Sequence, residues 1–333
     1  MKKHIYIYSP SGAVRDKAAF RRGVARLQAL GHEVEIDEAT LASHLRFAGD
    51  DETRLAAIHR AAASGADVAL VSRGGYGLTR ILSGIHYKKV AKAVEKGTLF
   101  VGISDFTAFQ NAVLARTGAV TWAGPALCEG FGVGGTPDIV DGHDHGEELV
   151  PDDIMEACFD DLIQGQGEGA GWRQNREAHP IAIDSVAAHA IDTGATVEFG
   201  IKNSVMWGGN LTVLTSLLGT PYFPDIKGGI LFLEDVGEHP YRIERMLTQL
   251  LHAGVLKRQK AILLGQFTEF KLVPHDKGFK LPSVVDWLRQ QIKTPILTNL
   301  PYGHVATKVI LPVGAKTNLM VEGRDALLFW GHV

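Results

Sequence analysis

The sequence of 333 residues contains only two cysteines, Cys128 and Cys158, and no Cys-x-x-Cys pair. So few cysteines exclude a framework of several disulfides and a zinc site built from cysteine pairs. This composition is typical of proteins in a reducing compartment. We therefore expect a cytoplasmic protein.

Long apolar runs are also missing. No stretch reaches the roughly 18 uninterrupted apolar residues that a membrane span requires. The amino terminus has two lysines but only a short alternating run before Pro10, which cannot be the apolar core of a signal peptide. We expect no association with a membrane.

An excess of one charge is lacking as well. Lysine and arginine number 34 and aspartate and glutamate number 37, which gives a formal net charge of −3. The charges are spread along the chain, without a basic block that could neutralise a phosphate backbone. A nucleic-acid partner is therefore not expected.

Apolar residues, by contrast, make up 45% of the chain, which is enough for two hydrophobic cores at this length. The first third alternates short apolar runs with helical patterns. That rhythm predicts an α/β fold with a parallel sheet, of the flavodoxin or Rossmann kind. The elements expected here are strands at 4–8, 33–36, 68–72 and 99–101 and helices at 16–30, 52–63 and 106–116.

The sequence loosens from about residue 130 to residue 175, where glycine and acidic residues dominate. Beyond it, strand signals outnumber helix signals, which predicts a second domain of mixed α/β type. We expect domains at 1–130 and 181–333 with a connecting segment at 131–180. Strands are predicted at 196–199, 230–233 and 261–265 and within 309–329, and an amphipathic helix at 240–253.

Ser104 stands between the strand expected at 99–101 and the helix expected at 106–116. A sharp strand-to-helix turn can lift a serine hydroxyl out of a sheet beside backbone N–H groups, as in a nucleophile elbow. Serine is also a common helix N-cap, and the pattern alone favours that structural role. Phe106 replaces the last glycine of Gly-x-Ser-x-Gly, which argues against an ordinary α/β-hydrolase.

The segment Arg73-Gly74-Gly75-Tyr76-Gly77 can form a backbone cradle, because glycines let N–H groups approach an oxyanion closely. A tight turn after a strand is the ordinary alternative. No Lys-Ser or Lys-Thr follows the glycines, and dinucleotide-binding spacing is missing, so a phosphate loop is disfavoured.

Ionisable residues also lie at the ends of two later strands. Glu234 and Asp235 follow the strand expected at 230–233, and strand alternation predicts that only one of them enters a site. His304 lies in the irregular segment Pro301-Tyr302-Gly303-His304, where an imidazole can act as a general base. Solvated acids and a surface histidine are the alternatives, because the chain has 14 histidines.

His143 and His145 form a second cluster, in Asp-Gly-His-Asp-His at 141–145. They have no third ligand at a recognisable spacing, so we interpret the cluster as a solvated loop. We expect neither a metal nor a cofactor.

Taken together, these segments resemble the LD-carboxypeptidase family of serine peptidases, which includes murein tetrapeptide carboxypeptidases and microcin C self-immunity peptidases. The matching segments occur in the family's order and span most of the chain. They are Ser9-Pro10-Ser11-Gly12, Arg73–Gly77, Gly102–Asp105, Gly208-Gly209-Asn210-Leu211, Leu233–Glu238 with Pro240–Ile243, and Pro301–His304.

The resemblance implies a Ser-Glu-His triad, with Ser104 as nucleophile, His304 as general base and then acid, and Glu234 orienting the imidazole. It favours Glu234 over Asp235. It implies an oxyanion hole of backbone N–H groups, for which Gly75 and Asp105 are the candidates.

The substrate implied by the resemblance is a small peptide with a C-terminal D-amino acid, usually a murein tetrapeptide that loses D-Ala. Its free carboxylate needs a partner, for which Arg73, a nearby backbone donor or another cation are the candidates. The resemblance also implies a homodimer.

Three other functions remain open. A microcin-immunity-type peptidase, or an amidase acting on another acylated amino acid, would use the same triad. A non-catalytic peptide-binding protein would not need all three triad residues. A nucleotide- or sugar-binding protein is disfavoured by the missing phosphate-binding spacings.

Overall fold

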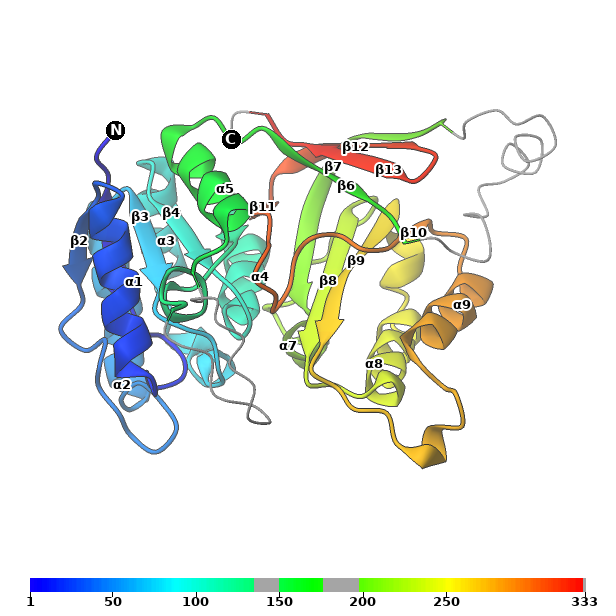
Figure 1. Cartoon of the computed structure of the whole chain (residues 1–333), viewed down its shortest axis with the longest axis horizontal. Helices are drawn as coiled ribbons and strands as arrows, with labels where there is room; N and C mark the ends of the chain where they lie inside the picture. Colours follow the sequence, from blue (N-terminus) through cyan, green and yellow to red (C-terminus); the bar gives the residue numbers. More distant parts are fainter. Residues whose placement is uncertain (135–149, 176–197, 332–333) are drawn as a thin grey trace. The chain divides into compact units, whose positions relative to one another are not determined.

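The chain folds into two compact units, coloured along the sequence in Figure 1. Unit 1 contains residues 1–167 and 306–311, and unit 2 contains residues 168–305 and 312–333. The segment 306–311 thus returns to unit 1 late in the sequence. The computed structural model describes residues 1–134, 150–175 and 198–331.

Unit 1 is built on a six-stranded sheet. Its strands are β1 (His4–Tyr8), β2 (Glu33–Ile36), β3 (Val68–Val71), β4 (Leu99–Gly102), β5 (Thr121–Ala123) and β11 (Leu311–Val313), of which the last two residues are counted in unit 2. Their order is β11-β5-β4-β3-β1-β2, and the four neighbouring pairs from β5 to β2 are parallel. All four residues of β3 are buried, as expected for a central parallel strand covered on both faces.

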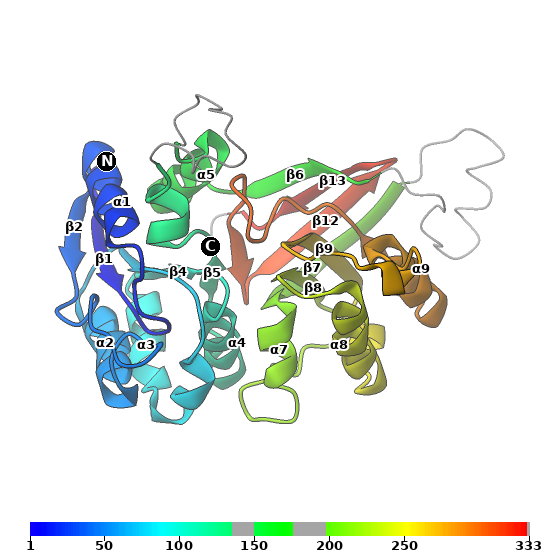
Figure 2. The same cartoon turned by 60° about the horizontal axis from the view of Figure 1, so that its bottom comes forward.

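Helices cover both faces of this sheet (Figure 2). One face carries α1 (Lys17–Ala29) and α5 (Asp153–Gln164), and the other carries α2 (Asp51–Ala63), α3 (Tyr87–Glu95) and α4 (Phe106–Thr117). Aspartate caps three of these helices: Asp16, Asp50 and Asp152 accept hydrogen bonds from backbone N–H groups of the first turn of α1, α2 and α5.

Helix α4 is the most deeply enclosed of these elements. Residues 106–114 are all buried, and the helix ends at Gly118 in the left-handed conformation. Because α4 directly follows β4, a rigid strand and a rigid helix flank the turn that contains Ser104.

Unit 2 contains a seven-stranded mixed sheet. Its strands are β6 (Gly169–Arg173), β7 (Glu198–Asn210), β8 (Ile230–Val236), β9 (Ala261–Thr268), β10 (Ile296–Leu297), β12 (Lys316–Glu322) and β13 (Asp325–Phe329). Their order is β10-β9-β8-β7-β12-β13-β6. The pairs from β10 to β7 are parallel, and the pairs from β7 to β6 are antiparallel.

The parallel half of this sheet is connected by helices α7 (Leu211–Ser216), α8 (Pro240–His252) and α9 (Leu281–Gln291). Pro240 occupies the first turn of α8, as its sequence predicts. The remaining short helical turns are η1 (Leu78–Arg80), η2 (Leu82–Gly84), η3 (Leu127–Phe131), η4 (Leu256–Arg258) and η5 (Pro274–Asp276).

The predicted fold class is confirmed: the amino-terminal sheet is largely parallel, and the carboxyl-terminal sheet is mixed and rich in strands. The range 131–180, expected to be a connecting segment, contains α5, which belongs to unit 1, and β6, which belongs to unit 2. The start of the strand predicted at 196–199 and the histidines at 143 and 145 lie outside the described residues. Within the described ranges, every helix is too short or too polar to cross a bilayer.

Candidate active site

Ser104 lies at a strained turn of unit 1. It joins β4 to α4 with a φ of 66°, in the left-handed region that non-glycine residues rarely adopt. Holding an L-residue there costs about 1–2 kcal/mol. The side chain of Asp105, the N-cap residue of α4, makes no capping hydrogen bond, and among the described residues of unit 1 the Ser104 hydroxyl makes none either. The turn therefore presents the serine hydroxyl instead of using it as a cap.

The glycine loop after β3 packs directly against this turn. A Cβ atom at position 74 would lie 2.5 Å from Ser104 Cβ and 2.7 Å from Ser104 Oγ. Gly75 and Gly77 have φ values of 116° and 139°, which side chains rarely tolerate. The loop can thus approach the serine only because these positions lack side chains.

Two candidate oxyanion donors lie beside the serine. Among the residues of unit 1 that the structure describes, the backbone N–H groups of Gly75 and Asp105 donate to no other group. The Asp105 side chain is 2% exposed and accepts hydrogen bonds from the Leu78 N–H, at 2.9 Å, and from Ser11. Burial raises the pKa of this carboxyl, although these donors and Arg54 oppose the shift. The carboxylate thereby pins the start of α4 to the end of the glycine loop.

Arg73 belongs to the same loop but is packed against it. Its guanidinium lies against Gly12 and Gly75, with Nε 3.6 Å from Glu129 Oε1, and its side chain is 15% exposed. Its charge is therefore close to an acidic group within unit 1. This position supports the glycine loop, and any contact of Arg73 with a substrate carboxylate stays a prediction.

Unit 2 brings Glu234 and His304 together. Glu234 is the fifth residue of β8, and His304 lies in the segment that follows β10. His304 Nδ1 is 2.8 Å from Glu234 Oε2, with the glutamate side chain fully buried and the imidazole 22% exposed. Because a carboxylate accepts the hydrogen bond, Nδ1 carries the proton and the lone pair is on Nε2. This tautomer suits a general base.

Asn210, at the end of β7, supports this pair from the side of the glutamate, a role that its sequence pattern does not predict. Its Nδ2 donates to Glu234 Oε1 at 3.1 Å and to Asp235 Oδ1 at 3.0 Å. Its Oδ1 accepts from the Val213 N–H at the start of α7, which fixes the orientation of the amide. The available signal was an asparagine at a strand-to-helix junction, which is typical of an N-cap.

Asp235 takes a supporting position. Its Oδ2 accepts hydrogen bonds from the backbone N–H and the hydroxyl of Thr212, at 2.9 and 2.8 Å. Burial raises the pKa of this carboxyl and the charge of Glu234 adds to the rise, while the bonds from Thr212 oppose it. Of the two acids, Glu234 is the one whose carboxylate lies 2.8 Å from His304 Nδ1.

The segment before His304 is packed against the sheet of unit 2. Tyr302 is 1% exposed, and its ring meets the ring of Phe232 edge-on, with centroids 5.3 Å apart. Gly303 has a φ of 146°, and a Cβ atom there would lie 3.0 Å from the Gln266 carbonyl oxygen and 3.3 Å from Glu234 Oε2. A side chain at 303 would therefore disturb the glutamate–histidine contact.

Each unit thus gathers its own candidates. Unit 1 holds Ser104 with Gly75, Asp105 and Arg73, which can supply a nucleophile and donors for an oxyanion. Unit 2 holds Glu234 and His304, which can supply an oriented base. The described residues contain no cluster of three or more His, Cys, Asp or Glu side chains suited to a metal.

Comparison with known proteins assigns the family. Residues 5–124 match the LD-carboxypeptidase N-terminal domain, and residues 203–319 match the LD-carboxypeptidase C-terminal domain. A probable murein peptide carboxypeptidase of Bacillus subtilis is 29% identical over 303 residues, which are 91% of this chain and 84% of the relative. The microcin C7 self-immunity protein MccF of Escherichia coli is 26% identical over 326 residues, 95% of this chain and 90% of the relative.

Solved structures agree. The crystal structure of muramoyltetrapeptide carboxypeptidase from Oxalobacter formigenes superposes with a TM-score of 0.78 at 36% sequence identity, covering 98% of each chain. A structure of MccF superposes with the same TM-score at 21% identity, covering 100% of this chain and 97% of that one, which shows the shared fold. The chain therefore belongs to the LD-carboxypeptidase family and is a peptidase.

Proposed function

We propose that this chain is a serine L,D-carboxypeptidase that releases terminal D-Ala from murein tetrapeptides. The observation that carries the proposal is the hydrogen bond between His304 Nδ1 and Glu234 Oε2, which orients an imidazole as a base. The strained turn at Ser104 supplies the matching nucleophile. The carboxypeptidase of Oxalobacter formigenes, at 36% identity, supports the substrate class.

In the proposed mechanism, Ser104 Oγ attacks the carbonyl carbon of the L,D-peptide bond while His304 Nε2 takes the hydroxyl proton. Glu234 stabilises the imidazolium that forms. The carbonyl oxygen becomes an oxyanion, for which the N–H groups of Gly75 and Asp105 are the proposed donors. His304 then protonates the leaving nitrogen, and D-Ala departs.

The acyl-enzyme that remains is hydrolysed by the reverse sequence. His304 removes a proton from water, the hydroxide adds to the ester carbon, and Ser104 Oγ leaves with a proton from the imidazole. The mechanism requires His304 Nε2 to come within about 3 Å of Ser104 Oγ in the substrate complex.

The proposed mechanism uses only side chains and backbone groups of the chain. Dialysis against EDTA should therefore leave the rate of D-Ala release unchanged.

The direct test follows D-Ala release from murein tetrapeptide by mass spectrometry, with the wild-type protein and Ser104→Ala. We expect release by the wild-type protein and a fall of about 10⁶-fold in kcat for the variant. Release by both proteins at similar rates would refute the serine mechanism. No release by either would refute the substrate assignment.

The similarity to MccF supports a second candidate, an immunity-type peptidase or amidase with the same triad. MccF has been crystallised with aspartyl sulfamoyl adenosine. Titration calorimetry of Ser104→Ala with this compound and with murein tetrapeptide separates the two candidates. Binding of the peptide alone supports the murein role, and binding of the nucleoside compound alone favours the immunity role.

We further propose that the protein acts in the cytoplasm as a homodimer. The two cysteines, both uncrosslinked, fit a reducing compartment. Sedimentation at micromolar concentration tests the dimer, and a mass of one chain would refute it.

A further inference from the structure

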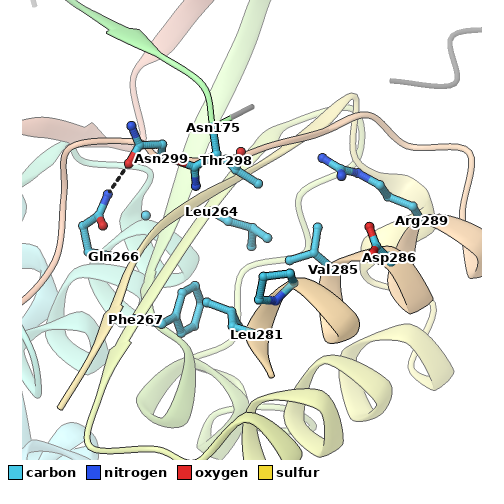
Figure 3. A pocket seen from close by; sticks show the side chains of 12 residues that line it. Asn175, Leu264, Gln266, Phe267, Leu281, Val285, Asp286, Arg289, Thr298 and Asn299 are labelled. Atoms are coloured by element: carbon cyan, nitrogen blue, oxygen red, sulfur yellow. Dashed lines mark hydrogen bonds between the residues drawn. The ribbon is translucent and has the colours of Figure 1, made fainter. Parts of the chain in front are cut away.

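A cavity of about 370 Å³ lies in unit 2 between α9 and β9 (Figure 3). Its walls combine apolar side chains of both elements with polar groups of the segment after β10. Glu234 and His304 do not line it. The lining residues are Asn175, Leu264, Gly265, Gln266, Phe267, Leu281, Pro282, Val285, Asp286, Arg289, Thr298 and Asn299.

Gln266 connects this cavity to the segment that precedes His304. Its Nε2 donates to Asn299 Oδ1 at 3.2 Å, the contact drawn in Figure 3, and to the Leu300 carbonyl oxygen at 3.1 Å. Its backbone N–H donates to the Tyr302 carbonyl oxygen at 2.9 Å. One residue of β9 therefore binds three positions of the five that lead up to His304.

The neighbouring residues of β9 extend the same contact. The Leu300 N–H donates to the Leu264 carbonyl oxygen at 3.1 Å. Gly265 lies so close to Tyr302 that a Cβ atom would collide with the Tyr302 carbonyl oxygen. The position of the segment 299–302 is thus set by residues 264–266, and the side chain of Gln266 is the part of this contact that mutation can remove without changing the backbone.

This anchoring bears on the imidazole because residues 299–302 lead directly into His304. Gly303, the only residue between Tyr302 and His304, has a φ open to glycine and contributes no side-chain packing. Without the Gln266 amide, the Tyr302 N–H, at 2.8 Å, is the one donor to the Leu300 carbonyl that remains within the described ranges.

We propose that Gln266 is a positioning residue that keeps His304 Nδ1 on Glu234. The inference rests on the proposed function, because the imidazole is the base of that reaction. Gln266 acts through the backbone of residues 299–302 and touches neither substrate nor reacting atoms. A displacement of a catalytic group by about 1 Å can cost on the order of 10²-fold in rate.

The first experiment measures kcat and KM of Gln266→Ala. We expect kcat to fall about 10–100-fold with KM changed less than about 3-fold, because the base is misplaced while binding groups stay. The side-chain amide removed in this variant lines the cavity. Acetamide at about 0.1–1 M should therefore take its place and restore part of kcat. Asp286→Ala is the matched control, since Asp286 lines the same cavity and makes no side-chain hydrogen bond to residues 299–302.

Gln266→Met guards against loss of folding, because it keeps the length of the side chain and removes both amide donors. If Gln266→Met has the same melting temperature as the wild-type protein but a reduced kcat, the proposal is supported. A kcat equal to that of the wild-type protein in both variants overturns it.

A readout without substrate separates this proposal from the proposed function. The proton on His304 Nδ1 should give a downfield NMR signal in the wild-type protein, assigned by its loss in His304→Gln. We expect the signal to broaden or disappear in Gln266→Ala and to return with acetamide. If the wild-type protein fails to cleave tetrapeptide, the proposed function fails, but this signal still decides the role of Gln266. A signal in Gln266→Ala equal to that of the wild-type protein would refute the positioning role.

Discussion

The turn at Ser104 in unit 1 and the Glu234–His304 pair in unit 2 are held in place by different means. Ser104 is placed by its backbone: a φ of 66° and a neighbouring glycine whose missing side chain makes room for it. The pair is placed by side-chain hydrogen bonds, from Asn210 to Glu234 and from His304 to Glu234. One half depends on strain and close packing, the other on a polar network.

This difference predicts different responses to mutation. A strained turn loses function when space is filled and gains stability when the strain is relieved. A buried polar network loses both function and stability when one member is removed, because its partners are left buried without hydrogen bonds.

Among the changes that test this comparison, the largest effect is expected from breaking the network. Glu234→Ala should lower kcat about 10²–10⁴-fold, because the imidazole loses its orienting acceptor. It should also destabilise unit 2 by about 1–3 kcal/mol, since the Asn210 amide loses a buried partner. Steady-state kinetics and urea unfolding check the two values, and a variant with normal kcat would refute the role of Glu234.

Filling the space beside the serine should have the next largest effect. Gly74→Ala places a Cβ atom 2.5 Å from Ser104 Cβ, so the turn must shift. We expect kcat to fall about 10²-fold. Gly200→Ala serves as the control, because the contact nearest to its added Cβ is an ordinary 3.9 Å to the Leu319 carbonyl oxygen. Equal kinetics for the two variants would contradict the packing argument.

Relieving the strain should have a smaller effect of opposite sign. Ser104→Gly removes the penalty for the left-handed conformation and should raise the free energy of unfolding by about 0.5–1 kcal/mol, after the extra chain entropy of glycine is counted. Ser104→Ala keeps the strain and should leave stability nearly unchanged. Both variants should be inactive, so chemical denaturation is the measurement, and equal stability of the two would argue against stored strain.

The smallest effect concerns pH. Burial raises the pKa of Asp105 above its usual value, so the folded state holds this proton more tightly than the unfolded state. The resulting contribution to stability is fully present below the unfolded pKa near 3.8 and is lost as pH rises through the folded pKa. Asp105→Asn should therefore show a weaker decline of stability as pH rises from about 4, measured by denaturant titration.

The local elements of unit 1 could be predicted closely from the sequence. The observed β1, β2 and α2 differ from the predicted ranges by at most one residue. The apolar periodicity of these elements and the aspartate cap of α2 depend only on neighbours in sequence, which is why pattern analysis can predict them. The mixed character of the second sheet was also predicted from its density of strand signals.

The interior of the candidate site was harder to predict. Strand alternation could not choose between Glu234 and Asp235, and the pairing of β8 with β9 shifts register between Leu233 and Asp235, which breaks simple alternation. Asn210 reaches acids 24 and 25 positions away, and Gln266 reaches a segment 33 positions away. Such contacts depend on which strands are neighbours, and a sequence pattern does not specify that order.

The late return of residues 306–311 to unit 1 has a consequence for synthesis on the ribosome. Thr307 donates to Asp152, the N-cap of α5, at 2.6 Å, and β11 covers the edge that β5 would otherwise expose. At about 5–20 residues per second, the roughly 140 residues made between α5 and this segment take about 7–28 s. During that time the nascent chain carries an open sheet edge, which is a template for pairing with other chains. A chain truncated before residue 306 should therefore aggregate through its amino-terminal half, although every residue lost lies near its carboxyl terminus.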